Sequence, residues 1–159
     1  MNGYADIYFA YGSNLSPWRI RERIPGARPL GNAWVDGYRL VERLYADIEP
    51  CEGARVWGFL YVITEEEATR LDVFEGFPRV YDIEGVNAHL DAKHSVVAYT
   101  YRMTEAAVRT RSGQPYPRDY RLICSAGAHA RGIPNPFHRK GDPKFGFRKG
   151  CGWAYGRPE

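Results

Sequence analysis

The pattern of hydrophobic and polar positions along this chain predicts short strands separated by turns, with a few helices between them. The run Val56–Ile63 is almost entirely apolar or β-forming, which is typical of a strand buried on both faces. Similar or alternating runs predict the full set of strands: Tyr4–Tyr11, Ala33–Leu44, Val56–Ile63, Tyr81–Leu90 and Ser95–Met103.

Three segments predict helices. Ser16-Pro17 supplies an N-cap and a first helical residue for a short helix that ends before Pro25-Gly26. The capping-box pattern T-x-x-E begins a second helix over Thr64–Gly76, and a third is expected over Pro117–Arg131. Strands with helices inserted between them indicate an α+β domain, and we expect a small mixed β-barrel with a few flanking helices.

Composition narrows the class of protein. The chain has 159 residues, 44% of them hydrophobic and 26% charged, which is typical of one soluble globular domain. The sequence has no apolar run of the roughly twenty residues that span a membrane. Its first residues lack the basic and apolar pattern of a signal peptide, so we expect a cytoplasmic protein. Three scattered cysteines and four scattered histidines show no disulfide or metal-ligand spacing, so no metal is expected.

The positive charge is concentrated at the C-terminal end. The net charge of the chain is +3, and residues 139–159 carry six basic against two acidic residues. We therefore expect a domain over 1–138 followed by a basic, aromatic-containing tail over 139–159. Such a tail can bind nucleic acid, but the interpretation that we favour is a solvated tail, and its aromatic side chains can equally pin it to the domain.

The segment Tyr11–Leu15 is the first candidate for chemistry. A strand ends there in a glycine-containing turn and a helix begins just after it. Such a junction leaves backbone N–H groups unpaired at the positive end of a helix, where a carboxylate, a phosphate or a developing oxyanion binds. The alternative is a tight turn in which Ser13 or Asn14 is only a local cap. No P-loop lysine follows, so a nucleotide site is not indicated.

Glu75 is the second candidate. It stands at the C-terminal end of a predicted helix, among the apolar neighbours Val73, Phe74 and Phe77. Burial and the negative helix end both raise the pKa of a carboxyl group, and a carboxyl group with a pKa near neutrality suits general acid–base catalysis. The alternative is an exposed glutamate at a helix end.

Five sequence blocks occur in order along the chain: Y-F-A-Y-G-S-N-L from Tyr8, G-Y-R-L from Gly37, V-W-G-F-L-Y from Val56, L-D-x-x-E-G-x-P-x-x-Y from Leu71 and Y-x-x-I-x-x-x-G-A from Tyr120. This set resembles the γ-glutamylcyclotransferase family over roughly residues 4–137. The resemblance implies a small mixed β-barrel. It also implies cyclisation of a γ-glutamyl amide to 5-oxoproline with release of an amine, without a cofactor.

The resemblance assigns a role to particular residues. Glu75 matches the catalytic acid/base of the family, and the substrate-binding positions are Tyr11, Gly12, Ser13, Asn14, Leu15, Tyr81 and Tyr120. The implied partner is a small γ-glutamyl molecule. A homodimer and the identity of the leaving amine are left open. Two other classes are weighed against the enzyme: a non-catalytic binding domain for a small acidic ligand, and a nucleic-acid-associated protein that uses the basic tail.

Overall fold

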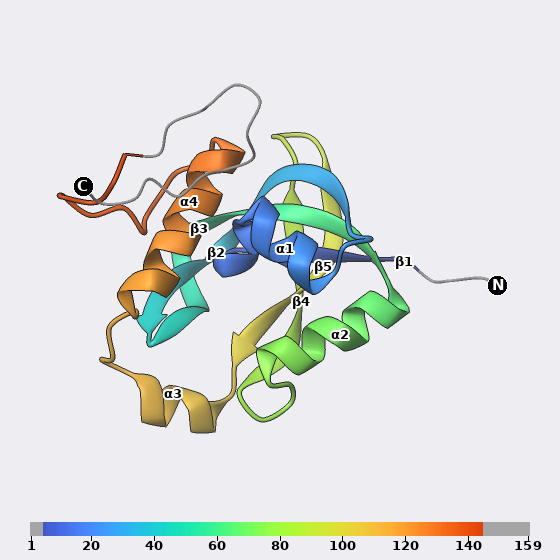
Figure 1. Ribbon diagram of the computed structural model, residues 1–159. Helices are drawn as coiled ribbons and strands as arrows, with labels where there is room; N and C mark the ends of the chain where they lie inside the picture. The colour runs from blue at the N-terminus through green and yellow to red at the C-terminus, as the bar shows by residue number, and fades with distance from the viewer. Residues whose placement is uncertain (1–4, 145–159) are drawn as a thin grey trace.

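A closed five-stranded barrel forms the centre of the protein in a computed structural model that describes residues 5–144 (Figure 1). The strands follow one another around the barrel as β1-β3-β2-β4-β5. The barrel is mixed because β1 pairs antiparallel with β3 and parallel with β5. Their bounds are Ala5–Ala10 for β1, Arg28–Arg43 for β2, Tyr45–Thr64 for β3, Tyr81–His89 for β4 and Ser95–Met103 for β5. The predicted α+β class and barrel are confirmed.

The hairpin of β2 and β3 is longer than the sequence pattern predicted. Leu44 alone separates the two strands, and it has a φ of 61°. The first half of β3 is not recognisable as a strand from the sequence because it contains polar residues. These residues are tolerated there because they form hydrogen bonds with other segments. Buried Asp47, for example, accepts hydrogen bonds from Arg43 at 2.7 Å and from the backbone N–H of Met103 at 2.8 Å.

Within residues 5–144, four α-helices and one 3-10 turn flank the barrel (Figure 1). The capping box that begins α2 is present, with reciprocal hydrogen bonds between Thr64 and Glu67. The helix α3 was not predicted, although Thr104 caps it in the same way as other helix starts. The bounds are Ser13–Leu15 for η1, Pro17–Arg23 for α1, Glu65–Glu75 for α2, Glu105–Arg111 for α3 and Arg118–Arg131 for α4.

Helix α4 packs directly on η1, far from it in sequence. Gly127 makes this contact possible, since a Cβ atom there would lie 2.5 Å from the backbone nitrogen of Ser16 and 2.8 Å from the carbonyl carbon of Leu15. Nothing larger than glycine fits without a shift of the backbone. The close packing therefore fixes the position of the turn that follows β1.

The beginning of the predicted tail is held against the domain. Asp142 forms a bidentate ion pair with the buried side chain of Arg121, and Arg139 pairs with Glu42 at 3.0 Å. The Arg121 guanidinium holds the pKa of Asp142 well below its usual range. The rest of the predicted tail lies outside the described residues. Within the described chain, no helix has both the length and the apolar character needed to cross a membrane.

Candidate active site

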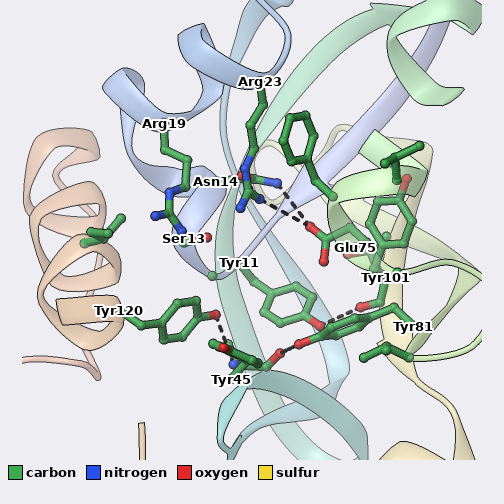
Figure 2. A pocket seen from close by; sticks show the side chains of 18 of the residues that line it. Tyr11, Ser13, Asn14, Arg19, Arg23, Tyr45, Glu75, Tyr81, Tyr101 and Tyr120 are labelled. Atoms are coloured by element: carbon green, nitrogen blue, oxygen red, sulfur yellow. Dashed lines mark hydrogen bonds and ion pairs between the residues drawn. The ribbon is translucent and has the colours of Figure 1, made fainter. Parts of the chain in front are cut away.

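A cavity of about 520 Å³ brings together the two candidate regions of the sequence (Figure 2). Its wall is built from the end of β1, η1, α1, the end of α2, the turn between β2 and β3, β5, and the α3–α4 region. Every residue that the resemblance assigned to the site lines this cavity except Leu15. Residues that are scattered over more than one hundred positions thus share one space.

Glu75 is the last residue of α2, and Gly76 ends the helix in the left-handed conformation with a φ of 66°. The Glu75 side chain is only 16% exposed. Its Oε1 accepts a hydrogen bond from Asn14 Nδ2 at 3.3 Å and lies 3.9 Å from a guanidinium nitrogen of Arg23 (Figure 2). The carboxyl group is therefore hydrogen-bonded directly to the turn after β1.

Burial raises the pKa of Glu75 to about 7, against the opposing effects of Arg23, Arg19 and Asn14. The direction is as expected from the sequence. Val73 and Phe74, the neighbours in sequence, line the cavity although they are 79% and 51% exposed. Buried aromatic residues from other elements, such as Tyr8 and Tyr101, line it as well.

The turn at residues 11–14 lines the cavity and carries unpaired backbone donors. The N–H groups of Gly12, Ser13 and Asn14 donate to no acceptor within residues 5–144, as expected for the first turn of a helix. The Asn14 side chain is almost completely buried: its amide nitrogen donates to Tyr8 at 3.0 Å, and its oxygen accepts from Arg23 at 3.0 Å. This network links the turn to Glu75 through one amide.

The carbonyl groups of the same turn are held from the opposite side. Tyr61 donates its hydroxyl proton to the Asn14 carbonyl at 2.8 Å. Arg131 donates to the Leu15 carbonyl at 3.2 Å and to the Tyr61 hydroxyl at 2.8 Å, and its guanidinium lies 3.8 Å from the centre of the Phe59 ring. These contacts fix the direction in which the opposite N–H groups point.

The tyrosines of the predicted site have distinct hydrogen bonds. Tyr81 donates to the carbonyl of Ala46 at 2.7 Å, so its proton is already used. Tyr120 accepts from the backbone N–H of Ala46 at 3.0 Å, so its own proton is not used in that bond (Figure 2). Tyr11 donates to the carbonyl of Tyr101 at 2.5 Å. Leu15 lies in the core at 1% exposure and does not reach the cavity.

Sequence reasoning missed three basic residues of the site, Arg111 at the end of α3 and two on α1. Arg19 and Arg23 are four positions apart on α1, and their side chains extend toward Ser13 and Glu75 respectively (Figure 2). The i, i+4 spacing immediately after the turn was a readable signal that both lie on one face of a helix. Among residues 5–144, no group of three His, Cys, Asp or Glu side chains is arranged to hold a metal ion.

Comparison with known proteins identifies the family. A family model described as "Gamma-glutamyl cyclotransferase, AIG2-like" matches residues 8–122. The chain belongs to this family. The γ-glutamylcyclotransferase of Mus musculus is 28% identical over 151 residues, which cover 87% of this chain and 78% of the mouse protein.

Solved structures agree with the family assignment. A crystal structure of a Homo sapiens protein described as uncharacterized has a TM-score of 0.74 at 26% identity, over 82% of both chains. A structure described as "Gamma-glutamyl cyclotransferase" has a TM-score of 0.71 at 24% identity, also over 82% of both chains, and shows the shared fold. The γ-glutamylcyclotransferase family match ends at residue 122, so it includes Glu75 and Tyr120 but not Gly127 or Arg131.

Proposed function

We propose that this protein is a γ-glutamylcyclotransferase that converts a γ-glutamyl amide into 5-oxoproline and a free amine. One observation carries the proposal: a buried carboxyl group, Glu75, with a pKa of about 7, lines a cavity of about 520 Å³ together with a turn that carries unpaired backbone N–H groups. A cavity that only bound a small anion would gain nothing from a carboxyl group beside the ligand.

The reaction needs no nucleophile from the protein. The α-amino nitrogen of the substrate attacks its own γ-carbonyl carbon, so that a C–N bond forms and a five-membered ring closes. The original amide C–N bond then breaks, and its nitrogen leaves with a proton as the free amine. Aligned intramolecular reactions reach effective molarities of about 10⁵ M or more, so holding the substrate in a folded conformation is a large part of catalysis.

Glu75 provides the two proton transfers. As a carboxylate it accepts a proton from the α-ammonium group, and as a carboxylic acid it returns a proton to the departing nitrogen. The second proton that the attacking nitrogen loses on ring closure passes to solvent. A pKa of about 7 allows both forms to be populated near neutral pH. General acid–base catalysis of this kind contributes about 10²- to 10⁴-fold.

The turn after β1 stabilises the charge that develops on the γ-carbonyl oxygen. The free N–H groups of residues 12–14 suit either this oxyanion or the α-carboxylate of the substrate. The hydroxyl of Tyr120 can donate its own proton and lies next to Gly12, where a Cβ atom would be 3.1 Å from it. We assign Tyr120 a donor role toward the substrate, and Tyr81 the role of holding Ala46 in place.

The test is the release of 5-oxoproline from γ-glutamyl dipeptides by purified Glu75→Gln and Glu66→Gln proteins. Glu66 is a matched control because it is an exposed residue of the same helix. We expect Glu75→Gln to lower kcat by at least about 10²-fold, with the fold retained, and the control to keep wild-type turnover. Wild-type rates in Glu75→Gln would refute the mechanism.

Two further predictions from the sequence belong to this proposal. A cytoplasmic location is tested by cell fractionation, and a homodimer is tested by sedimentation of the purified protein.

Tyr120→Phe is expected to raise KM for the γ-glutamyl substrate with little change in thermal stability.

A further inference from the structure

Asp72 lies three positions before Glu75 on α2 and is not among the residues that line the cavity. Residues three apart on a helix are neighbours on one face, so the two carboxyl groups lie on the same side of α2. The Asp72 backbone carbonyl accepts hydrogen bonds from the N–H groups of Gly76 and of Phe77, the latter at 2.9 Å. Asp72 thereby belongs to the turn of helix that ends at Glu75, and its position determines where that helix end lies.

The Asp72 side chain ties this helix end to the barrel. Its Oδ1 accepts a hydrogen bond from the Tyr101 hydroxyl on β5 at 2.6 Å. Tyr101 is only 2% exposed and lines the cavity on the same side as Glu75 (Figure 2). A hydrogen bond from a hydroxyl to a carboxylate is charge-assisted and stronger than one between neutral groups. The bond therefore fixes the end of α2 against β5.

Tyr101 is also bound to the segment that leads into the turn after β1. Its backbone carbonyl accepts a hydrogen bond from the Tyr11 hydroxyl at 2.5 Å. The residue before it, Thr100, donates its hydroxyl proton to the carbonyl of Phe9 at 2.8 Å. The Tyr101 ring packs edge-on against Tyr8, with ring centres 5.8 Å apart. One residue of β5 thus connects the helix that carries the acid to the strand that carries the turn.

Asp72 is the acidic group among those that act on Glu75. These groups are Asp72 on α2, Arg19 and Arg23 on α1, Tyr8 on β1, Tyr11 after it, Tyr81 on β4, Tyr99 on β5 and Tyr120 on α4. The cavity also contains the titratable side chains of Tyr45, Tyr101, Arg111 and Asp119. Burial raises the pKa of each tyrosine that acts on Glu75, so these tyrosines are neutral near pH 7. Burial is also the main cause of the raised pKa of Glu75; the two arginines lower this pKa, and Asp72 raises it further.

We propose that Asp72 is a positioning residue for Glu75, which acts through its hydrogen bond with Tyr101 and through its own negative charge. The hydrogen bond keeps the Glu75 carboxyl group at a fixed separation from the turn, because Tyr101 is bound to both elements. Misplacement of a catalytic group by about 1 Å can cost about 10²-fold in rate. The charge favours the protonated form of Glu75, which is the form that protonates the departing nitrogen. This inference rests on the proposed function and adds a residue that acts behind the acid.

A double-mutant cycle tests the hydrogen bond. Tyr101→Phe removes the hydroxyl but keeps the backbone carbonyl that binds Tyr11, and Asp72→Ala removes the acceptor. With a γ-glutamyl dipeptide as substrate, we expect each variant to lower kcat by about 10-fold, with a smaller change in KM and with the fold retained in circular dichroism. The double variant should lose no more than the slower single variant, because the two groups act as one unit. Wild-type kcat in Asp72→Ala, or losses that multiply in the double variant, would overturn the proposal.

Asp72→Asn separates the charge from the hydrogen bond, since the amide keeps the shape and an oxygen that accepts from Tyr101. This variant should recover most of the kcat that Asp72→Ala loses. The midpoint of the acid limb of kcat/KM should fall by about half a pH unit, as expected for two unit charges about 6 Å apart in water. Glu66→Gln is the matched control, because it removes an exposed negative charge from the same helix and should leave the midpoint where it is. A residue with a merely structural role would move neither midpoint, and this result for Asp72→Asn would overturn the role of the charge.

A measurement without substrate separates this inference from the proposed function. The ¹³C resonance of the Glu75 side-chain carboxyl group, assigned by its absence in Glu75→Gln, is titrated in the wild type and in Asp72→Asn. If the titration midpoint falls in Asp72→Asn but the wild type never forms 5-oxoproline, the enzymatic proposal fails and the action of Asp72 on Glu75 stands. If 5-oxoproline forms and neither the midpoint nor kcat responds to changes at Asp72, the enzymatic proposal stands and the role of Asp72 fails.

Discussion

Replacing Glu75 by glutamine should stabilise the folded protein at alkaline pH while it removes activity. The carboxyl group has a pKa of about 7 in the folded protein against an ordinary value of 4.5. Because the folded-state pKa is raised, the stability that the group contributes is complete below about pH 4.5 and is lost as the pH rises through 7. Each unit of pKa difference corresponds to about 1.4 kcal/mol, so the free energy of unfolding falls by roughly 3 kcal/mol in total.

The measurement is urea unfolding of the wild type and of Glu75→Gln at about pH 5 and about pH 8.5. Glutamine cannot ionise, so the stability of the variant relative to the wild type should rise by about 2.5 kcal/mol between the two pH values. Other titrating groups are present in both proteins and cancel in the comparison. If the difference between the two proteins were the same at both pH values, Glu75 would have an ordinary pKa and the catalytic argument would lose its basis.

Three other predictions concern activity. The acid limb of kcat/KM should have its midpoint near pH 7. Arg23→Gln should move this midpoint upward by about one pH unit, because the Arg23 cation lowers the pKa of Glu75 and the variant lacks that cation. Gly12→Ala should raise KM in steady-state assays, since its Cβ would lie 3.1 Å from the Tyr120 hydroxyl; an unchanged KM would count against this contact. Arg131→Gln should lower kcat about 10-fold by releasing the carbonyls of the turn, and Arg131→Lys should recover part of it.

The elements with strong local signals were predicted from the sequence. The β1, β4 and β5 strands, the capping box of α2 and the glycine that ends it all appear close to their expected positions. In each case the local pattern and the tertiary environment favour the same structure. Glu75 and the turn at residues 11–15 could be predicted as site residues because the end of a helix and the end of a strand are recognisable from the sequence alone.

Features that depend on distant partners could not be predicted. The first half of β3 can be polar because Asp47 accepts hydrogen bonds from Arg43 and from the backbone of β5. The sequence of the strand itself does not indicate these partners. The cavity around Glu75 is also lined by aromatic residues from elsewhere in the chain, such as Tyr8 and Tyr101, which its sequence neighbours do not reveal. Arg111 enters the site from a seven-residue helix that has too few residues to show a period.

The contact of Gly127 with Ser16 has a consequence for synthesis of the protein on the ribosome. The turn with its free N–H groups is specified by the first fifteen residues, yet its geometry is fixed by α4, whose last residues are made more than one hundred positions later. A nascent chain can close most of its barrel and still lack an assembled cavity wall. The cavity wall is therefore completed only after α4 has been synthesised and has docked on the turn.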